Sequence, residues 1–252
     1  MKNIIIYGKN SFLAKNFIFN YKKQHNLFLF NLYFKNEKIF KKKFIKFVKK
    51  NKITHIINFA ACNDNSLNNN NSKKIFNSNF SLPLTLLEIS NNLNLDIFLF
   101  LSKEIDKNDS KYDNFYSLSK NLLLENIKYF KNKNRIRIIN IDSVYGPFDL
   151  NYERLIPSVI KNILKNKKKK SINLNQSKKM IYVGNVNKII ESLIFSKKKI
   201  IYKKIKSTKF YVRSIYNFLK KYHLHKSYDK FKNYKSFITT FDWYLKHYGK
   251  TK

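Results

Sequence analysis

Residues 3–14 read Asn3-Ile-Ile-Ile-Tyr-Gly-Lys-Asn-Ser-Phe-Leu-Ala14, and this stretch indicates the fold class. The mostly apolar run Asn3–Tyr7 is typical of a buried strand, and Gly8–Ser11 predicts a turn. From Phe12 to Tyr21 the apolar side chains recur at helical spacing, which predicts a helix. A strand, a tight turn and a helix in this order form the βα unit from which parallel sheets are built.

The same alternation of strands and helices continues along the chain. Further strands are predicted over 27–33, 54–59, 97–101 and 135–141, further helices over 40–49, 75–93 and 115–130, and a polar loop over 63–74. The strands are continuous apolar runs, which indicates a parallel sheet with both faces covered. We therefore expect an α/β fold, a Rossmann-like doubly wound parallel sheet, whose ligands bind at the carboxyl ends of the strands.

The region after Gly146 is less regular. A helix is predicted over 155–164, short strands over 172–174 and 180–183, and a helix over 186–195, whereas the remainder is dense in Lys and Tyr and weakly patterned. We expect one domain over residues 1–150 and a small carboxyl-terminal annex over 151–252. About residues 180–195 of the annex should pack back on the first domain.

The charge is strongly positive, with 52 Lys and Arg against 15 Asp and Glu, a formal net charge of +37 over 252 residues. Such an excess suggests a polyanionic partner such as nucleic acid. However, the chain is crowded with Lys, Asn, Ile, Phe and Tyr, all of which have AT-rich codons. Its lysines are spread over the whole length, and its only arginines are Arg135, Arg137, Arg154 and Arg213. We therefore favour genome composition over specific nucleic-acid binding.

Several classes of protein are excluded by simple counts. The single Cys62 rules out an intramolecular disulfide framework and a zinc site with several cysteines. His223 and His225 have no accompanying carboxylate or cysteine pattern, so we expect no metal site. No run of about 18 apolar residues is present, and the apolar stretch at the start is too short for a signal peptide. We expect a cytoplasmic protein without a membrane span.

The first turn resembles a dinucleotide-binding motif. Its usual form is Gly-x-x-Gly-x-x-Gly, whereas here only Gly8 is retained, with Ser11 and Ala14 at the other two positions. The missing glycines would allow close approach of the backbone to a pyrophosphate, so we expect a strained but usable geometry. The predicted cofactor-binding residues here are Gly8, Ser11, Phe12 and Leu13. An ordinary βα turn is the alternative interpretation.

A second motif is Tyr116-Ser-Leu-Ser-Lys120, which places a phenol and an ammonium on one face of a helix. A nearby ammonium favours the phenolate and lowers the pKa of a tyrosine toward a value useful for proton transfer. The spacing alone carries little information, because Tyr-x-x-x-Lys occurs seven times in this chain. Only Tyr116 opens a predicted helix that lies between two strands of the sheet.

Seven segments, taken in order, resemble the extended short-chain dehydrogenase/reductase family, the NAD-dependent epimerase/dehydratases that act on nucleotide sugars. The resemblance covers about residues 1–195. The segments are Gly8–Ala14, His55–Ala61, Asn79, Phe98–Ser102, Tyr116–Lys120, Asp142–Pro147 and Lys178–Val186.

This resemblance implies roles for the matching residues. Tyr116 would be the catalytic acid/base, and Lys120 would hold the cofactor ribose and depress the pKa of Tyr116. Ser102 would hydrogen-bond the substrate oxygen; if the alignment shifts by one residue, Lys103 takes this place and the hydroxyl is missing. Tyr116, Lys120 and Ser102 are thus the predicted catalytic residues.

The resemblance also implies a cofactor and a substrate. Ala60 and Ala61 would line NAD or NADP, and Ser143 and Val144 would pass near the nicotinamide. Asn31 stands where the family has a ribose-binding acidic residue, which leaves both cofactors open. The expected function is an epimerase, dehydratase or reductase of a nucleotide sugar for surface polysaccharide, active as a homodimer through the helix of Tyr116. A catalytically degenerate nucleotide-binding member is the alternative, with a basic nucleic-acid-binding protein less favoured.

Overall fold

A computed structural model describes most of the chain as two compact units. The described residues are 1–30, 32, 34, 36–62, 71–102, 114–130, 135–165, 172–225 and 234–248. The first unit consists of Met1–Ile141 and Ile190–Ile205, and the second of Asp142–Ile189 and Lys206–Lys252. The chain therefore leaves the first unit after Ile141 and returns to it at Ile190.

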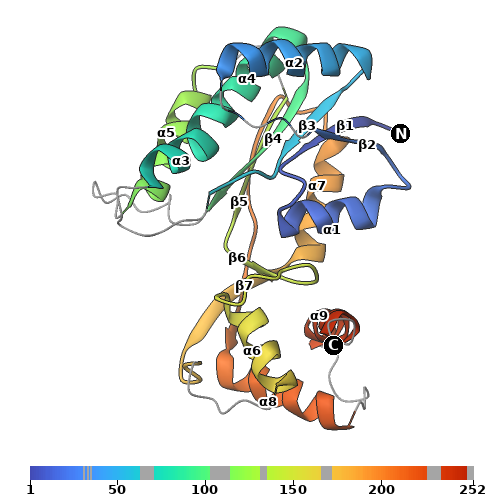
Figure 1. The fold of residues 1–252 in the computed structure, drawn as a ribbon, viewed down its shortest axis with the longest axis vertical. Helices are drawn as coiled ribbons and strands as arrows, with labels where there is room; N and C mark the ends of the chain where they lie inside the picture. The colour runs from blue at the N-terminus through green and yellow to red at the C-terminus, as the bar shows by residue number, and fades with distance from the viewer. Residues whose placement is uncertain are drawn as a thin grey trace. The chain divides into compact units, whose positions relative to one another are not determined.

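A parallel sheet of six strands forms the centre of the first unit (Figure 1). Its order is β2-β1-β3-β4-β5-β8, and neighbouring strands in this order are parallel. The strands are β1 (Asn3–Tyr7), β2 (Asn26–Phe30), β3 (His55–Asn58), β4 (Asp96–Ser102), β5 (Ile136–Ile141) and β8 (Ile200–Lys204). The predicted α/β, Rossmann-like class is confirmed.

Helices cover both faces of this sheet (Figure 1). They are α1 (Phe12–Tyr21), α2 (Glu37–Lys50), α3 (Ser72–Phe76), α4 (Leu82–Leu93) and α5 (Phe115–Ile127), with a π-helical turn, η2 (Asn77–Ser81), between α3 and α4. Of the loop predicted over 63–74, residues 63–70 lie outside the described part of the chain. Side chains cap three of the helices: Ser11, Asn36 and Asn114 each accept a hydrogen bond from a backbone N–H in the first turn.

The core explains why the strands are apolar throughout. Ile5, Ile56 and Leu99 belong to a buried cluster that also includes residues of α2, α4 and α5. Ile4 and Ile6 are equally buried, although alternate side chains of a strand point to opposite faces. Both faces of the sheet are therefore covered, as the continuous apolar runs indicated.

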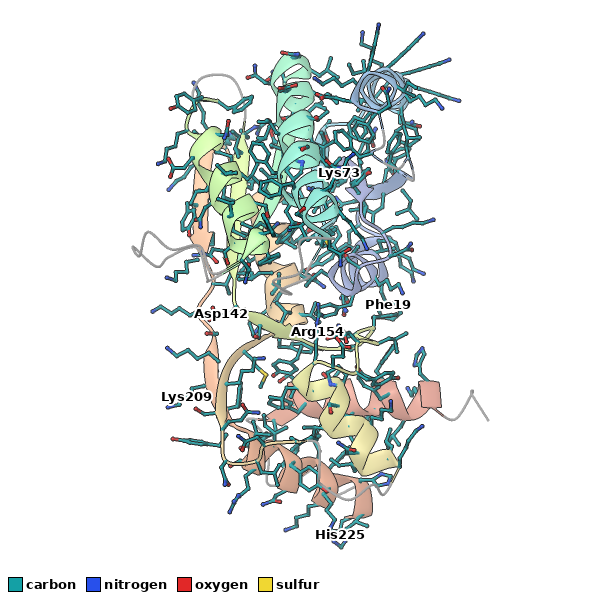
Figure 2. All side chains as sticks on the ribbon, turned by 60° about the vertical axis from the view of Figure 1, so that its left-hand side comes forward. Phe19, Lys73, Asp142, Arg154, Lys209 and His225 are labelled. Atoms are coloured by element: carbon teal, nitrogen blue, oxygen red, sulfur yellow. The ribbon has the colours of Figure 1, made fainter. Side chains whose placement is uncertain are left out.

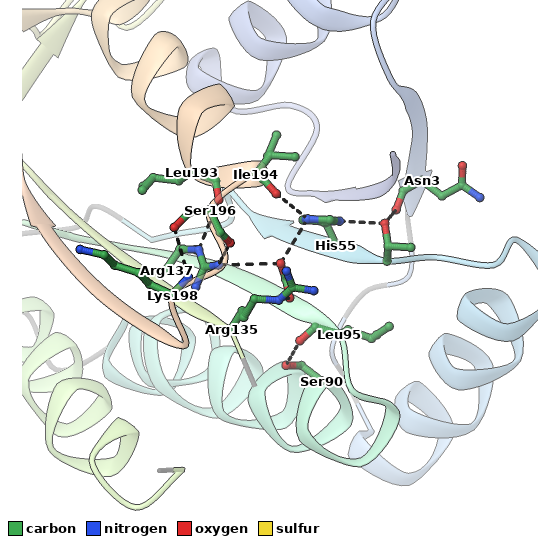
Figure 3. Close-up of polar contacts among 12 residues, drawn as sticks. Asn3, His55, Ser90, Leu95, Arg135, Arg137, Leu193, Ile194, Ser196 and Lys198 are labelled. Carbon is green, nitrogen blue, oxygen red and sulfur yellow. Dashed lines mark hydrogen bonds and ion pairs between the residues drawn. The ribbon is translucent and has the colours of Figure 1, made fainter. Parts of the chain in front are cut away.

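A polar cluster fastens the returning segment to the sheet (Figure 3). The side chain of Arg137 is fully buried and donates hydrogen bonds to the carbonyl oxygens of Leu193, Ser196 and Lys199, at 3.3, 2.7 and 3.0 Å. The ring nitrogen Nε2 of His55 lies 3.2 Å from the carbonyl oxygen of Ile194. These bonds satisfy backbone carbonyls that enter the interior, so they hold the strand β8 in the sheet.

The second unit has a smaller sheet and its own core. Strands β6 (Ser143–Tyr145) and β7 (Ser177–Tyr182) are parallel, and β9 (Thr208–Tyr211) pairs antiparallel with β7. Its helices are α6 (Leu155–Leu164), α7 (Val183–Ile194, which continues into the first unit), α8 (Val212–His225) and α9 (Lys235–Tyr248). The tail that was weakly patterned in the sequence therefore provides two helices and the last strand of this unit.

Aromatic side chains dominate the core of the second unit. The ring of Tyr145 stacks on that of Phe237 with centroids 4.5 Å apart, and its hydroxyl lies 2.7 Å from Ser236 Oγ. Burial raises the pKa of Tyr145 to about 12, so this phenol is a neutral packing residue. The predicted strand over 172–174 is wrong: Leu174 lies in a turn, and the side chain of Asn173 accepts a hydrogen bond from the backbone of Asn175.

The basic side chains are dispersed over the molecule. Among the side chains drawn in Figure 2, nitrogen-tipped ones project from helices and strands of both units, with Lys73 on α3 and Lys209 on β9 as labelled examples. None of the described helices is long and apolar enough to cross a membrane. Within the described ranges, no group of three or more His, Cys, Asp or Glu could hold a metal ion.

Candidate active site

The candidate site lies at the carboxyl edge of the large sheet, where β1 ends in a turn. Gly8 follows β1 directly and has a φ of +80°, a conformation that favours glycine. A Cβ atom at this position would lie 2.4 Å from the backbone nitrogen of Ala60. The turn after β1 and the segment after β3 therefore approach each other more closely than a side chain would allow.

Replacing Gly8 with Ala should destabilise the protein by at least about 2 kcal/mol. The left-handed conformation alone costs a residue with a Cβ roughly 1–2 kcal/mol. The contact with the backbone of Ala60 adds to this cost, because a backbone cannot move aside as a flexible side chain can. Urea denaturation monitored by circular dichroism measures the difference. A loss below about 0.5 kcal/mol would contradict the observed approach of the two segments.

Ser11 replaces the second glycine without the expected strain. Its backbone is extended, with φ −65° and ψ 149°, and its hydroxyl oxygen accepts a hydrogen bond from the N–H of Ala14 at 3.2 Å. The prediction of a strained geometry is wrong at this position, because a serine serves as a regular helix N-cap. Ala14 is fully buried, whereas Phe12 and Leu13 are half-buried in the first turn of α1. The helix thus presents a capped N-terminus, which favours an anion, at the carboxyl edge.

The segment after β3 lies next to this turn. Ala60 is half-buried and Ala61 exposed. The backbone N–H of Ala60 donates to the side-chain oxygen of Asn58 at 3.1 Å. A second amide, that of Asn79, binds the backbone of Cys62. Neither Asn58 nor Asn79 was predicted as a site residue. Asn79 is one of the segments that carry the family resemblance, and its place in their order was the one available signal.

Helix α5 positions the predicted catalytic pair. Asn114 caps the helix by accepting from the N–H of Ser117 at 2.9 Å, so Tyr116 lies in the first turn. Tyr116 is half-buried, and Lys120 lies one turn later and is buried. The ammonium of Lys120 donates to the carbonyl oxygen of Phe100, in β4, at 3.1 Å. This bond ties the middle of α5 to the carboxyl end of the sheet.

The environment of Lys120 is unusual for a lysine. Burial lowers its pKa from 10.5 to about 8. In the described part of the chain, no carboxylate forms an ion pair with it. Lysine is rarely buried unless it is paired, and such a group in a fold of this kind is a candidate functional residue. The ammonium can donate to hydroxyl groups or stabilise a neighbouring phenolate.

The other predicted site residues lie at the ends of β4 and β2 and in β6. Ser102 is the last residue of β4 and pairs in register with Ile141, but its side chain, like Asn31 and Lys103, lies outside the described part of the structure. Ser143 is exposed and Val144 half-buried, and both belong to strand β6 of the second unit. Their contact with a nicotinamide stays a prediction.

One known protein family matches most of the chain. The model of the NAD dependent epimerase/dehydratase family matches residues 19–200. The chain belongs to this family. A sequence search of the curated proteins finds no match.

The fold of this family member is shared with several solved enzymes. UDP-glucose 4-epimerase from Thermotoga maritima, crystallised with UDP-glucose, is 12% identical, with a TM-score of 0.76 over 98% of this chain and 99% of that one. UDP-glucuronic acid 4-epimerase from Bacillus cereus, in complex with NAD, is 14% identical, with a TM-score of 0.75 over 99% and 98%. dTDP-4-dehydrorhamnose reductase from Bacillus anthracis, in complex with NADP, is 17% identical, with a TM-score of 0.72 over 89% and 82%. At these identities the likeness concerns the fold.

Proposed function

We propose that the chain is an NAD- or NADP-dependent epimerase, dehydratase or reductase that acts on a nucleotide sugar, in the synthesis of surface polysaccharide. The observation that carries this proposal is the buried Lys120, which has no carboxylate partner among the described residues and lies one helical turn from Tyr116. Family membership and the nucleotide-sugar enzymes of the same fold support it.

The residues at the carboxyl edge suit a dinucleotide. The turn at Gly8 and the N-terminus of α1 would hold the pyrophosphate, because backbone N–H groups and the helix dipole favour a phosphate. Lys120 would donate to the ribose hydroxyls, and Ala60 would lie along the cofactor. When bound, the nicotinamide supplies hydride exchange with a carbon of the sugar. Both NAD and NADP stay open, since Asn31 lies outside the described residues.

Tyr116 would act as the acid and base at the sugar hydroxyl. A phenol with an ordinary pKa of about 10 is a poor base at neutral pH. Lys120, with a pKa of about 8, is still mostly protonated at pH 7. Its positive charge would therefore stabilise the phenolate of Tyr116. The same ammonium would orient the ribose, and Ser102 at the end of β4 would hydrogen-bond the substrate oxygen.

Turnover of nucleotide sugars tests the proposal. The purified chain is incubated with NAD, NADP or their reduced forms and a panel of UDP-, dTDP- and GDP-linked hexoses and 4-keto hexoses. Absorbance at 340 nm and NMR spectra of the sugar report the products. We expect the sugar linked to one of these nucleotides to be epimerised, dehydrated or reduced. A panel without turnover, together with retained binding of NADH, would favour the catalytically degenerate member instead.

We further propose that the enzyme is cytoplasmic and forms a homodimer through α5. Nucleotide sugars and reduced nicotinamide cofactors are cytoplasmic metabolites, which supports the location. The dimer rests on the family resemblance alone, and sedimentation equilibrium would test it: a monomer at micromolar concentration would contradict it.

A further inference from the structure

The last side chain of β1 reaches the segment that follows β2. The hydroxyl of Tyr7 donates a hydrogen bond to the carbonyl oxygen of Leu32 at 2.7 Å. In the register of these two parallel strands, Tyr7 lies opposite Phe30, the last residue of β2. The bond therefore continues the link between the two strands beyond the point where their backbone pairing ends, and it satisfies a backbone carbonyl that has left the sheet.

The phenol of Tyr7 lies among phenylalanine rings. Tyr7 is only 7% exposed, and its ring meets that of Phe40, in α2, edge-on with centroids 5.9 Å apart. Burial raises the pKa of Tyr7 to about 12, so its hydroxyl stays protonated and is a donor at neutral pH. A hydroxyl is costly to bury without a partner. The bond to Leu32 therefore offsets the cost of a tyrosine at a position where phenylalanine would pack equally well.

Three described residues of the segment between β2 and α2 are held by such contacts. Leu32 is held through its carbonyl oxygen, and the ring of Phe34 meets that of Phe40 with centroids 5.2 Å apart. The side chain of Asn36 caps α2 by accepting from the N–H of Ile39 at 3.0 Å. Leu32 and Phe34 also pack against the buried core of the first unit. The backbone after β2 is therefore positioned from both β1 and α2.

This segment lies where the adenosine half of a dinucleotide would bind. Since β1 and β2 are adjacent and parallel, the segment after β2 and the turn at Gly8 lie at the same edge of the sheet. In doubly wound folds the pyrophosphate lies at the turn after the first strand, and a residue about 20 positions further on hydrogen-bonds the adenosine ribose. That distance along the chain leads here to the end of β2.

We propose that Tyr7 is a positioning residue for the adenosine half of the cofactor. Its hydroxyl holds the backbone at Leu32, so that the ribose meets an ordered segment while the pyrophosphate binds at Gly8. Without the hydroxyl, the carbonyl oxygen of Leu32 loses its partner and the segment is released from β1. The nicotinamide half, bound near Tyr116 and Lys120, does not depend on this bond. This inference rests on the proposed function, because it requires that a dinucleotide binds at this edge.

Binding of the two halves of the cofactor to full-length Tyr7→Phe tests this role. The substitution keeps the ring and removes only the hydroxyl. AMP and 2′-phospho-AMP represent the adenosine halves of NAD and NADP, and nicotinamide mononucleotide represents the other half. We expect the affinity for the adenosine half, and for the whole reduced cofactor, to fall about fivefold, which is the effect of one net hydrogen bond. The affinity for nicotinamide mononucleotide should equal that of the wild type. Isothermal titration calorimetry measures all three.

Tyr222→Phe is the matched control. Tyr222 is also 7% exposed, and its hydroxyl donates to Oδ1 of Asp242 at 2.9 Å, but both residues belong to the second unit. Urea denaturation should show a loss of stability in both variants, because each loses a hydrogen bond made by a buried phenol. Tyr222→Phe should nevertheless bind both halves of the cofactor as the wild type does. The control therefore separates a lost positioning contact from a general loss of stability.

The outcomes separate this inference from the proposed function. If the wild type binds NADH or NADPH and Tyr7→Phe binds it equally tightly, the positioning role is overturned while the proposed function stands. An equal loss of affinity for both halves, or the same loss in Tyr222→Phe, also overturns it, because reduced stability then accounts for the effect. If the wild type itself binds neither cofactor, the proposed function fails, and the role of Tyr7 fails with it.

Discussion

Phenylalanine in place of Tyr116 should reduce turnover by about 10²- to 10⁴-fold and leave cofactor binding unchanged. The ring and its half-buried position in the first turn of α5 are kept, and only the hydroxyl that we propose exchanges the proton is lost. This range is the usual contribution of general acid–base catalysis. Initial rates with the substrate identified from the panel, and titration with NADH, measure the two quantities.

Tyr129→Phe is a matched control for this variant. Tyr129 also precedes a lysine by four residues, but its side chain is 86% exposed beyond the end of α5. Its turnover should equal that of the wild type. Normal turnover in Tyr116→Phe would show that the proton passes through another group, and the assignment of the catalytic pair would be wrong.

Methionine in place of Lys120 should have two opposite effects, a loss of turnover and a gain in stability. Burial lowers the pKa of Lys120 from 10.5 to about 8, so at pH 7 the folded protein holds an ammonium in an unfavourable place. One pKa unit corresponds to about 1.4 kcal/mol, so this penalty is at most roughly 3.5 kcal/mol. Methionine fills a similar volume without a charge. The free energy of unfolding should rise by roughly 1–3 kcal/mol, and turnover should fall at least about 10²-fold.

The pH dependence of this gain has a definite sign. The pKa of Lys120 is lower in the folded than in the unfolded chain, so between pH 8 and 10.5 the unfolded chain binds more protons. The contribution of this group to wild-type stability therefore increases with pH across this window. The advantage of Lys120→Met should be complete at pH 7 and nearly gone at pH 10.5. Urea denaturation at several pH values measures the difference in the free energy of unfolding between Lys120→Met and the wild type. A difference that grows with pH would contradict a buried ammonium at Lys120.

Local sequence patterns predicted the first and last residues of two helices correctly. The helices predicted over 12–21 and 155–164 are observed as Phe12–Tyr21 and Leu155–Leu164, because their apolar residues recur on one face. Strand β8 could not be found in this way. Its side chains are mostly exposed, and it is held by pairing with β5 and by the bonds from Arg137 to the segment before it. These contacts join residues about 60 positions apart. The spacing of apolar residues within a short segment cannot predict such contacts.

The candidate site was predictable to a similar extent. Gly8 and the pair Tyr116 and Lys120 could be predicted as site residues because each follows a strand of the sheet, and this context depends only on segment order. The hydrogen bonds of Asn79 could not be predicted from the sequence. They join residues 17 positions apart and depend on a π-helical turn, which has no characteristic spacing of apolar residues. The cap at Ser11 was not predicted, because serine in place of the second glycine was expected only to strain the turn, whereas a serine at this position can cap the helix.

Fluorescence titration with NADH and NADPH tests most directly whether a dinucleotide occupies the carboxyl edge of the sheet. Wild-type protein should bind at least one of them saturably. Gly8→Ala should bind the same cofactor at least about tenfold more weakly, because its Cβ displaces the backbone of Ala60. Circular dichroism checks that this variant is folded. Absence of binding to both cofactors, or equal binding by Gly8→Ala, would contradict the account.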